Sequence, residues 1–321
     1  MEGVKGLTGE LMVKEKDGEG YRMPAVTANG ITMYYEDYGK KEDPPLVLII
    51  GLGSQLTDWP ASFCEGLVER GLRVVCFDNR DCGLSTKMDG AGMLSPVLLL
   101  PALKLGFRVK LPYTLGEMAR DTVGLMEALQ LKRAHIAGSS MGGAIAQLVA
   151  GRYPEKVLSL TCFYSSSGRP GLPGPKLRVA LRMARQPKGE DREAWTDYFQ
   201  EVFTLIGTPR QDPEEQRRKA ARRVERSLCP GGTRRQLAAL TAGGSRVALL
   251  QRITVPTLVI SGSADPLMPY RCGRDIAEHV SGARFELIEG MGHDLPERMI
   301  PRLVDLLAGH ALANTGRTVK S

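Results

Sequence analysis

A serine lies at the centre of a short glycine-bounded segment, residues 138–142 (Gly-Ser-Ser-Met-Gly), which has the Gly-x-Ser-x-Gly pattern. An apolar run at residues 134–137 precedes this segment, and a helical run of small residues at 143–150 follows it. A strand–turn–helix junction of this kind exposes the hydroxyl of Ser140 above the edge of a sheet, where a base can activate it. The pattern predicts a serine nucleophile, and the alternative interpretation is a glycine-rich helix start that only packs closely.

A serine nucleophile needs a base, and His293 is the histidine in the most suitable position. It lies in a glycine-rich loop, residues 290–294, directly after an apolar strand pattern at residues 285–288. Loops at the carboxyl ends of strands carry the sites of open α/β sheets. The other histidines fit structural roles, within a strand or at helix ends: His135, His279 and His310.

The carboxylate that orients such a base is expected between the serine and the histidine in the chain. Asp265 follows the apolar run at residues 257–260, so we predict that it is the third member of the site. Asp294 is an alternative, but its place next to the histidine makes a hydrogen bond to the same ring awkward. Two earlier acidic residues are expected instead to hold a turn, with Arg80 as their partner: Asp78 and Asp81.

A carbonyl group attacked by serine also needs N–H donors for the negative charge that develops on its oxygen. Met141, directly after the serine, offers one backbone N–H at the start of a helix. The loop that follows the apolar strand at residues 46–50 is expected to supply the other donor. We predict that this donor is the N–H of Leu52, with Gly53 as the alternative.

The elements that must position these residues form an α/β pattern. Buried apolar strands alternate with helices, which predicts a mostly parallel central sheet of about eight strands flanked by helices. Residues 164–252 interrupt this pattern between two strands and are helical and charged, so we predict an inserted helical cap. The expected organisation is a polar N-terminal arm (1–22), a core (23–163 and 253–312), the cap (164–252) and a C-terminal tail (313–321).

A second insertion, residues 88–114, has an apolar centre. It predicts either a loop that packs on the cap or an apolar wall at the entrance for a substrate.

Composition and charge exclude several other classes of protein. The net charge is +7, and residues 164–252 hold 18 Lys and Arg against 9 Asp and Glu. Acidic residues interleave with these cations at helical spacing, which favours a solvated helix face over a nucleic-acid surface. The 6 cysteines show no CxxC spacing, and neither a secretory signal nor a membrane-spanning run is visible. We therefore expect a cytoplasmic protein with no metal, no cofactor, no nucleic-acid partner and no stable membrane insertion.

Three separate motifs, at residues 138–143, 261–266 and 290–293, resemble those of the α/β-hydrolase superfamily in that chain order. The resemblance covers roughly residues 25–312. Within the superfamily, residues 51–60, 77–85 and 290–296 are similar to aclacinomycin methylesterase and related carboxylesterases. One departure is that Ile50 precedes Gly51 where many members have a histidine that supports the oxyanion loop.

This resemblance implies a serine carboxylesterase that acts on a small-molecule ester through an acyl-enzyme intermediate. It implies Ser140 as nucleophile, His293 as base and Asp265 as acid, with oxyanion donors at Leu52 and Met141. The apolar centre of the second insertion favours an ester with an apolar acyl or alcohol part. The same fold and triad also serve thioester, lactone and carbon–carbon bond hydrolysis, and a non-catalytic ligand receptor on this fold is a further alternative.

Overall fold

The computed structural model describes residues 16–17, 20–21, 24–90 and 109–316. Most of the expected N-terminal arm and most of the second insertion lie outside the described residues. Two short N-terminal strands, β1 (Lys16–Asp17) and β2 (Gly20–Tyr21), pair antiparallel with each other.

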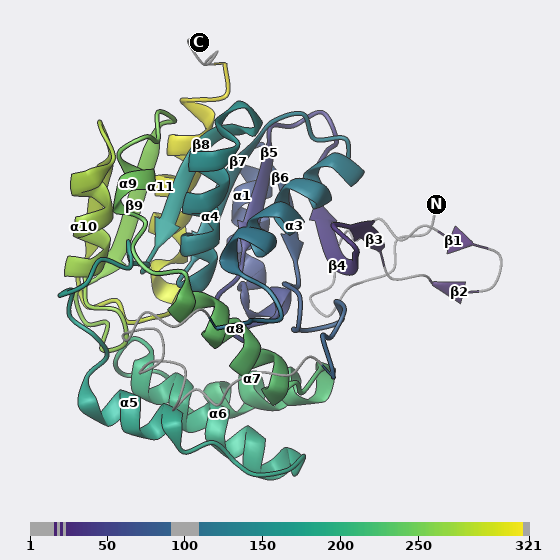
Figure 1. Ribbon diagram of the computed structural model, residues 1–321, viewed down its shortest axis with the longest axis vertical. Helices are drawn as coiled ribbons and strands as arrows, with labels where there is room; N and C mark the ends of the chain where they lie inside the picture. Colours follow the sequence, from purple (N-terminus) through teal and green to yellow (C-terminus); the bar gives the residue numbers. More distant parts are fainter. Residues whose placement is uncertain (1–15, 18–19, 22–23, 91–108, 317–321) are drawn as a thin grey trace.

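An eight-stranded sheet forms the centre of the described part of the chain, in the order β10-β9-β8-β7-β5-β6-β4-β3 (Figure 1). The strands β5 to β10 run parallel, whereas β3 and β4 pair antiparallel at one edge around a turn at Asn29 and Gly30. Both turn residues have positive φ angles, 48° and 77°, as this two-residue hairpin requires. The strands are β3 (Ala25–Ala28), β4 (Ile31–Tyr38), β5 (Pro45–Ile49), β6 (Arg73–Phe77), β7 (Ala134–Ser139), β8 (Val157–Phe163), β9 (Thr257–Gly262) and β10 (Arg284–Ile288). The predicted α/β class and strand number are confirmed.

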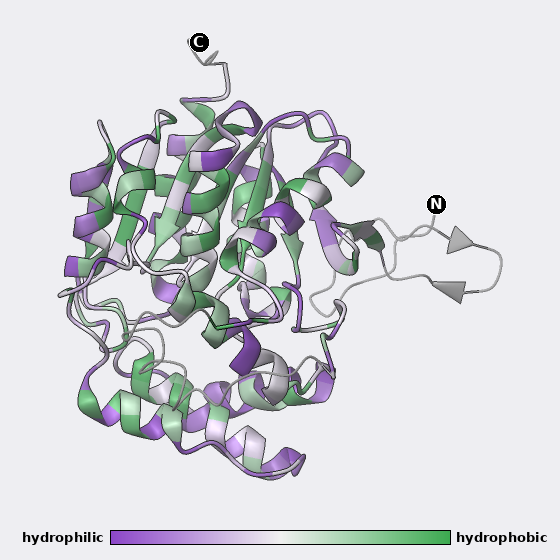
Figure 2. Ribbon diagram, in the orientation of Figure 1, coloured by the Kyte–Doolittle hydropathy of each residue, from purple (hydrophilic) through white to green (hydrophobic). Residues whose placement is uncertain are grey.

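Helices cover both faces of the sheet, which explains why its central strands are apolar throughout. Along β5, Val47 and Ile49 join the core cluster on one face, and Leu46 and Leu48 join the cluster on the other. Figure 2 shows the apolar residues gathered along the sheet and on the helix sides that meet it. The first face carries α3 (Leu115–Ala128), α4 (Met141–Arg152) and α10 (Arg271–His279), and the second carries α1 (Ala61–Glu69) and α11 (Ile300–Leu312).

The chain between β8 and β9 holds four longer helices, followed by a single short one, and we call the segment with the four longer helices the helical insert: α5 (Leu177–Ala184), α6 (Arg192–Ile206), α7 (Pro213–Arg226) and α8 (Pro230–Ala242). They have a small core of their own, centred on Trp195, Tyr198, Val202 and Val224. Figure 1 shows them grouped beside one end of the sheet. Hydrogen bonds from the insert to residues that follow β5, β6 and β10 identify this end as the carboxyl edge.

The remaining elements are short. They are α9 (Val247–Leu250) and three 3-10 turns, η1 (Leu56–Asp58), η2 (Pro154–Lys156) and η3 (Glu297–Met299). In the part of the chain that the structure describes, no helix is both long and apolar enough to cross a membrane.

Candidate active site

Ser140 occupies the whole turn between β7 and α4, because β7 ends at Ser139 and α4 begins at Met141. Its backbone has φ 54° and ψ −116°, a conformation that residues other than glycine rarely adopt. Hydrogen bonds on both sides of the residue hold it there: its N–H donates to the carbonyl of Phe163 (2.9 Å), and its carbonyl accepts from the hydroxyl of Ser165 (2.7 Å) as well as from backbone N–H groups in the first turn of α4. The hydroxyl of Ser140 has no hydrogen-bond partner among the described residues, so it is available to a reactant.

The flanking glycines of the motif are required by close backbone packing. A Cβ at Gly138 would overlap the carbonyl oxygen of Gly142, and a Cβ at Gly142 would overlap that of Ile49. The Gly-x-Ser-x-Gly pattern therefore reflects a turn too tight for side chains at either position.

His293 and Asp265 form a buried pair. The Nδ1 atom of His293 lies 2.7 Å from an Asp265 carboxylate oxygen, and the two side chains are 7% and 0% exposed. The other carboxylate oxygen accepts the backbone N–H groups of Leu267 and Met268, both at 2.8 Å. These contacts fix the carboxylate against rotation, and they hold the imidazole so that Nε2 is the nitrogen left for proton exchange.

Tyr164 connects the serine turn with this pair. It directly follows Phe163, the residue that accepts the N–H of Ser140, and its ring centroid lies 4.6 Å from that of His293. Burial raises the pKa of Tyr164, so its ring packs as a neutral phenol. Residues 163 and 164 thus contact both Ser140 and His293, a role for Tyr164 that no sequence motif indicated.

The loop after β5 lies against the serine turn. A Cβ placed on Gly51 would be 3.3 Å from the Cβ of Ser140. The N–H of Gly53 is already occupied, because it donates to the side-chain oxygen of Gln236 at 2.7 Å. The N–H groups of Leu52 and Met141 have no acceptor among the described residues, which favours Leu52 over Gly53 as a donor to a bound oxyanion.

The loop after β6 is fastened to the helical insert. Asp78 accepts the N–H groups of Leu56 and Leu84 and forms an ion pair with Arg226 at 2.7 Å. Asp81 forms a bidentate ion pair with Arg235, in which its two carboxylate oxygens accept guanidinium N–H groups at 2.8 and 2.7 Å. Both aspartates thus lie in the turn that the sequence predicted for them, and both also hold the insert.

The prediction that Arg80 partners these aspartates is wrong. Its guanidinium instead pairs with both carboxylate oxygens of Asp121 on α3, each at 2.6 Å. The planar fork of arginine matches a carboxylate in this geometry, and both side chains are buried.

Asp294 does not serve the ring of its neighbour His293 but ties the loop to the helical insert. Its carboxylate accepts the N–H and hydroxyl of Thr208, at 2.9 and 2.6 Å, and the side-chain amide of Gln211. The N–H of His293 itself donates to the carbonyl of Ile206 at 2.8 Å. The end of α6 and the segment between α6 and α7 therefore hold the loop that carries the histidine.

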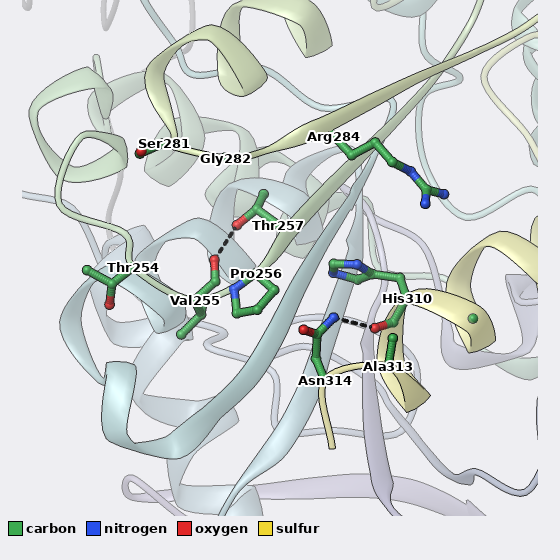
Figure 3. Close-up of a pocket in the computed structure, with 11 residues that line it drawn as sticks. Thr254, Val255, Pro256, Thr257, Ser281, Gly282, Arg284, His310, Ala313 and Asn314 are labelled. Carbon is green, nitrogen blue, oxygen red and sulfur yellow. Dashed lines mark hydrogen bonds between the residues drawn. The ribbon is translucent and has the colours of Figure 1, made fainter. Parts of the chain in front are cut away.

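A cavity of about 410 Å³ lies at the opposite edge of the sheet (Figure 3). Its lining includes Thr257 and Arg284, the first residues of β9 and β10, together with His310 and Asn314. It is remote from Ser140, which follows the carboxyl end of β7. Among the described residues, no group of three or more His, Cys, Asp or Glu side chains is arranged to hold a metal ion.

The sheet order, the strained serine turn and the histidine–carboxylate pair together define an α/β hydrolase. The sequence agrees, because residues 44–297 match the family described as the alpha/beta hydrolase fold. The chain belongs to this family.

Two relatives with similar sequences are methylesterases. Rhodomycin D methylesterase DauP of Streptomyces sp. (strain C5) is 30% identical over 327 residues, which cover 90% of this chain and 98% of the relative. Rhodomycin D methylesterase DnrP of Streptomyces peucetius is 29% identical over 316 residues, with the same two shares covered. The chain is an ester-hydrolysing enzyme, as the sequence motifs predicted.

A solved structure supports the fold independently. The enol-lactonase from Burkholderia xenovorans LB400 aligns with a TM-score of 0.69 at 23% identity, over 89% of this chain and 99% of that one. At this level of identity the likeness shows the shared fold.

Proposed function

We propose that the protein is a serine carboxylesterase that uses Ser140, His293 and Asp265 as a catalytic triad through an acyl-enzyme intermediate. The observation that carries the proposal is the 2.7 Å contact between His293 Nδ1 and Asp265, beside Tyr164, the residue that follows the hydrogen-bond acceptor of the strained Ser140 turn. A serine hydroxyl becomes a useful nucleophile only when a base removes its proton and a carboxylate orients that base.

In the proposed mechanism, Ser140 Oγ attacks the ester carbonyl while Nε2 of His293 takes its proton. His293 then returns the proton to the leaving alcohol, and the acyl group stays on Ser140. Water, activated by the same imidazole, releases the carboxylic acid and restores the serine. Asp265 holds the imidazole in the required tautomer and stabilises its charged form.

The N–H groups of Leu52 and Met141 are the proposed donors to the oxyanion. Met141 is the first residue of α4, so the positive end of the helix dipole adds to its N–H at the same place. The unoccupied N–H of Leu52 lies in the loop that packs against Ser140.

We further propose that residues 164–252 act as a cap under which the ester binds. The support is the position of the helical insert across the carboxyl edge of the sheet, next to the loops that carry His293 and Leu52. The methylesterase relatives make methyl esters of apolar acids the first substrate class to test.

The test is hydrolysis of p-nitrophenyl esters, from acetate to palmitate, and of methyl esters, by wild type and by Ser140→Ala. We expect kcat to fall by about 10⁵-fold or more in the variant, because the nucleophile is removed. Ser139→Ala, which removes the neighbouring hydroxyl, should retain activity. Activity that survives in Ser140→Ala would overturn the assignment of the nucleophile, and a wild type inactive on every ester would turn the search to thioesters, lactones and carbon–carbon bonds.

A further inference from the structure

Side chains of the helical insert hold the loop after β5 at Gly53. The N–H of Gly53 donates to Oε1 of Gln236 at 2.7 Å, and its carbonyl accepts from the guanidinium of Arg223. The first turn of α8 also packs directly on this glycine, because a Cβ there would lie 2.7 Å from the hydroxyl of Thr233. Gly53 has φ +61°, so it takes a backbone conformation that suits glycine in this restricted space.

The side chain of Gln236 is itself fixed in the orientation that contacts Gly53. Its side chain is fully buried, and its amide nitrogen donates to the carbonyl of Arg80 at 2.7 Å. The second hydrogen bond fixes the amide orientation, so that its oxygen points to Gly53. Gln236 therefore joins the loop after β5 to the loop after β6 through one side chain of the insert.

Arg223, which donates to the carbonyl of Gly53, is also fixed by contacts of its own. Its guanidinium lies over the rings of Phe199 and Phe203, with 4.6 and 5.4 Å to the ring centroids, and it pairs with Asp58 at 3.2 Å. The two contacts at Gly53 are thus made by side chains that are themselves fixed.

The position of Gly53 limits where the N–H of Leu52 can point. Peptide units are planar, so the N–H of Gly53 shares a rigid plane with the carbonyl of Leu52. The neighbouring plane, which carries the N–H of Leu52, is joined to that plane through the φ and ψ angles of Leu52, and its other end is Gly51, which packs on Ser140. With both ends held, the N–H of Leu52 has a restricted range of directions. The clamp also removes the N–H of Gly53 from the available donors.

We infer that Gln236 is a positioning residue for the oxyanion hole: it holds the peptide after Leu52 so that the N–H of Leu52 is aimed at the ester oxygen in the transition state. This inference rests on the proposed esterase function. It makes the helical insert a working part of the catalytic geometry, in addition to its place over the substrate.

The test compares Gln236→Met with Gln236→Glu. Methionine has a similar volume but loses both hydrogen bonds, whereas glutamate keeps an acceptor for Gly53 and loses the donor to Arg80. We expect kcat to fall about tenfold or more in Gln236→Met with KM nearly unchanged, because a misplaced donor weakens transition-state binding. Gln236→Glu should recover part of the loss.

Gln147→Met is the matched control. Gln147 is also fully buried and makes two hydrogen bonds, to the carbonyl of Ser166 and from the guanidinium of Arg246. Its substitution should lower the free energy of unfolding to a similar extent but leave kcat unchanged. A boronic acid, which forms a tetrahedral adduct with serine, should bind Gln236→Met about tenfold more weakly than wild type, and should bind Gln147→Met like wild type.

Equal kcat values and equal boronic acid affinities in Gln236→Met and Gln147→Met would overturn the inference. The esterase proposal would survive that result if Ser140→Ala were inactive and wild type active. If Gln236→Met does not fold, Gln236→Asn decides, because its side chain is one methylene too short to contact Gly53 and Arg80 together. A kcat and a boronic acid affinity equal to those of wild type in Gln236→Asn would then overturn the inference.

Discussion

Two aspartates lie close to His293, and their hydrogen bonds give them different roles at the scale of single residues. Asp265 places one oxygen on the imidazole and the other on two backbone N–H groups. Both carboxylate oxygens of Asp294 accept hydrogen bonds from the segment between α6 and α7, one from Thr208 and the other from Gln211. The geometry therefore supports Asp265 as the carboxylate that orients His293.

Replacing each aspartate by asparagine tests this division of roles. Asp265→Asn should lower kcat by roughly 10³- to 10⁴-fold, because an amide favours the wrong imidazole tautomer while the backbone contacts keep the loop folded. Asp294→Asn should lower kcat far less, since it weakens only the connection between loop and insert. Steady-state kinetics and circular dichroism of both variants make the measurement, and equal losses of kcat in the two would contradict the assignment.

At the scale of elements, ion pairs explain the basic excess of residues 164–252. The helix face predicted from the sequence is present on α7, where Lys219 pairs with Glu215 at 2.9 Å and Arg218 with Glu214 at 3.7 Å. Other cations of the insert have a different use, because they pair with aspartates of the core: Arg223 with Asp58, Arg226 with Asp78 and Arg235 with Asp81. Part of the positive charge therefore fastens the insert to the core.

The pKa of the Asp81 carboxyl group is lowered by its contacts, including the ion pair with Arg235 of the helical insert. Burial alone would raise the pKa of its carboxyl group, but the hydrogen bonds from Arg235 and Tyr113 outweigh burial and lower it. The carboxylate is thus charged in the folded protein, and its stabilising contribution is lost only when the pH falls through that lowered pKa.

Breaking one buried pair should destabilise the protein strongly. Arg226→Met leaves the fully buried carboxylate of Asp78 without its cation, and we expect the free energy of unfolding in urea to fall by about 3–5 kcal/mol. Arg218→Met, which removes two exposed pairs, with Asp212 and with Glu214, should change it by less than about 1 kcal/mol. The double variant Arg226→Met/Asp78→Asn should lose less than the sum of its single variants, and strict additivity would show that the two side chains are not coupled.

At the scale of the whole molecule, the sequence predicted the sheet and the three candidate triad residues because each depends on local signals. Ser140, Asp265 and His293 all follow apolar strand patterns and lie in turns with recognisable glycines. Gln236 carries no such signal, since its contact with Gly53 spans 183 residues and an isolated glutamine in a helix has no distinctive spacing. The Arg80 prediction was wrong for the same reason: only the folded chain brings Asp121 within reach.

A buried histidine remote from the candidate site should make global stability depend on pH. His135 is 1% exposed on β7 and bonded to the hydroxyl of Ser159, and burial, followed by the nearby His310 and Arg133, lowers its pKa to about 4. Between pH 6.5 and 4 the unfolded chain binds a proton at this residue that the folded protein does not, so stability decreases on acidification. The total effect is about 3 kcal/mol.

Urea unfolding at several pH values, for wild type and His135→Gln, measures this contribution. The variant should show a flatter dependence of unfolding free energy on pH over the same interval, because glutamine does not titrate. Parallel curves for the two proteins would exclude His135 as the source.

The attachment of the helical insert at Gly53 and at Asp294 constrains how this enzyme can diversify. An insert grafted from a relative would bring a new binding surface but would also remove Gln236 and Thr208, and with them the supports of two loops in the recipient core. Chimeras should therefore regain turnover only when the loops after β5 and β10 are exchanged together with the insert. Over a lineage, the same dependence would make the insert and these loops accumulate substitutions in concert, so that new substrate preferences arise as coordinated sets of changes.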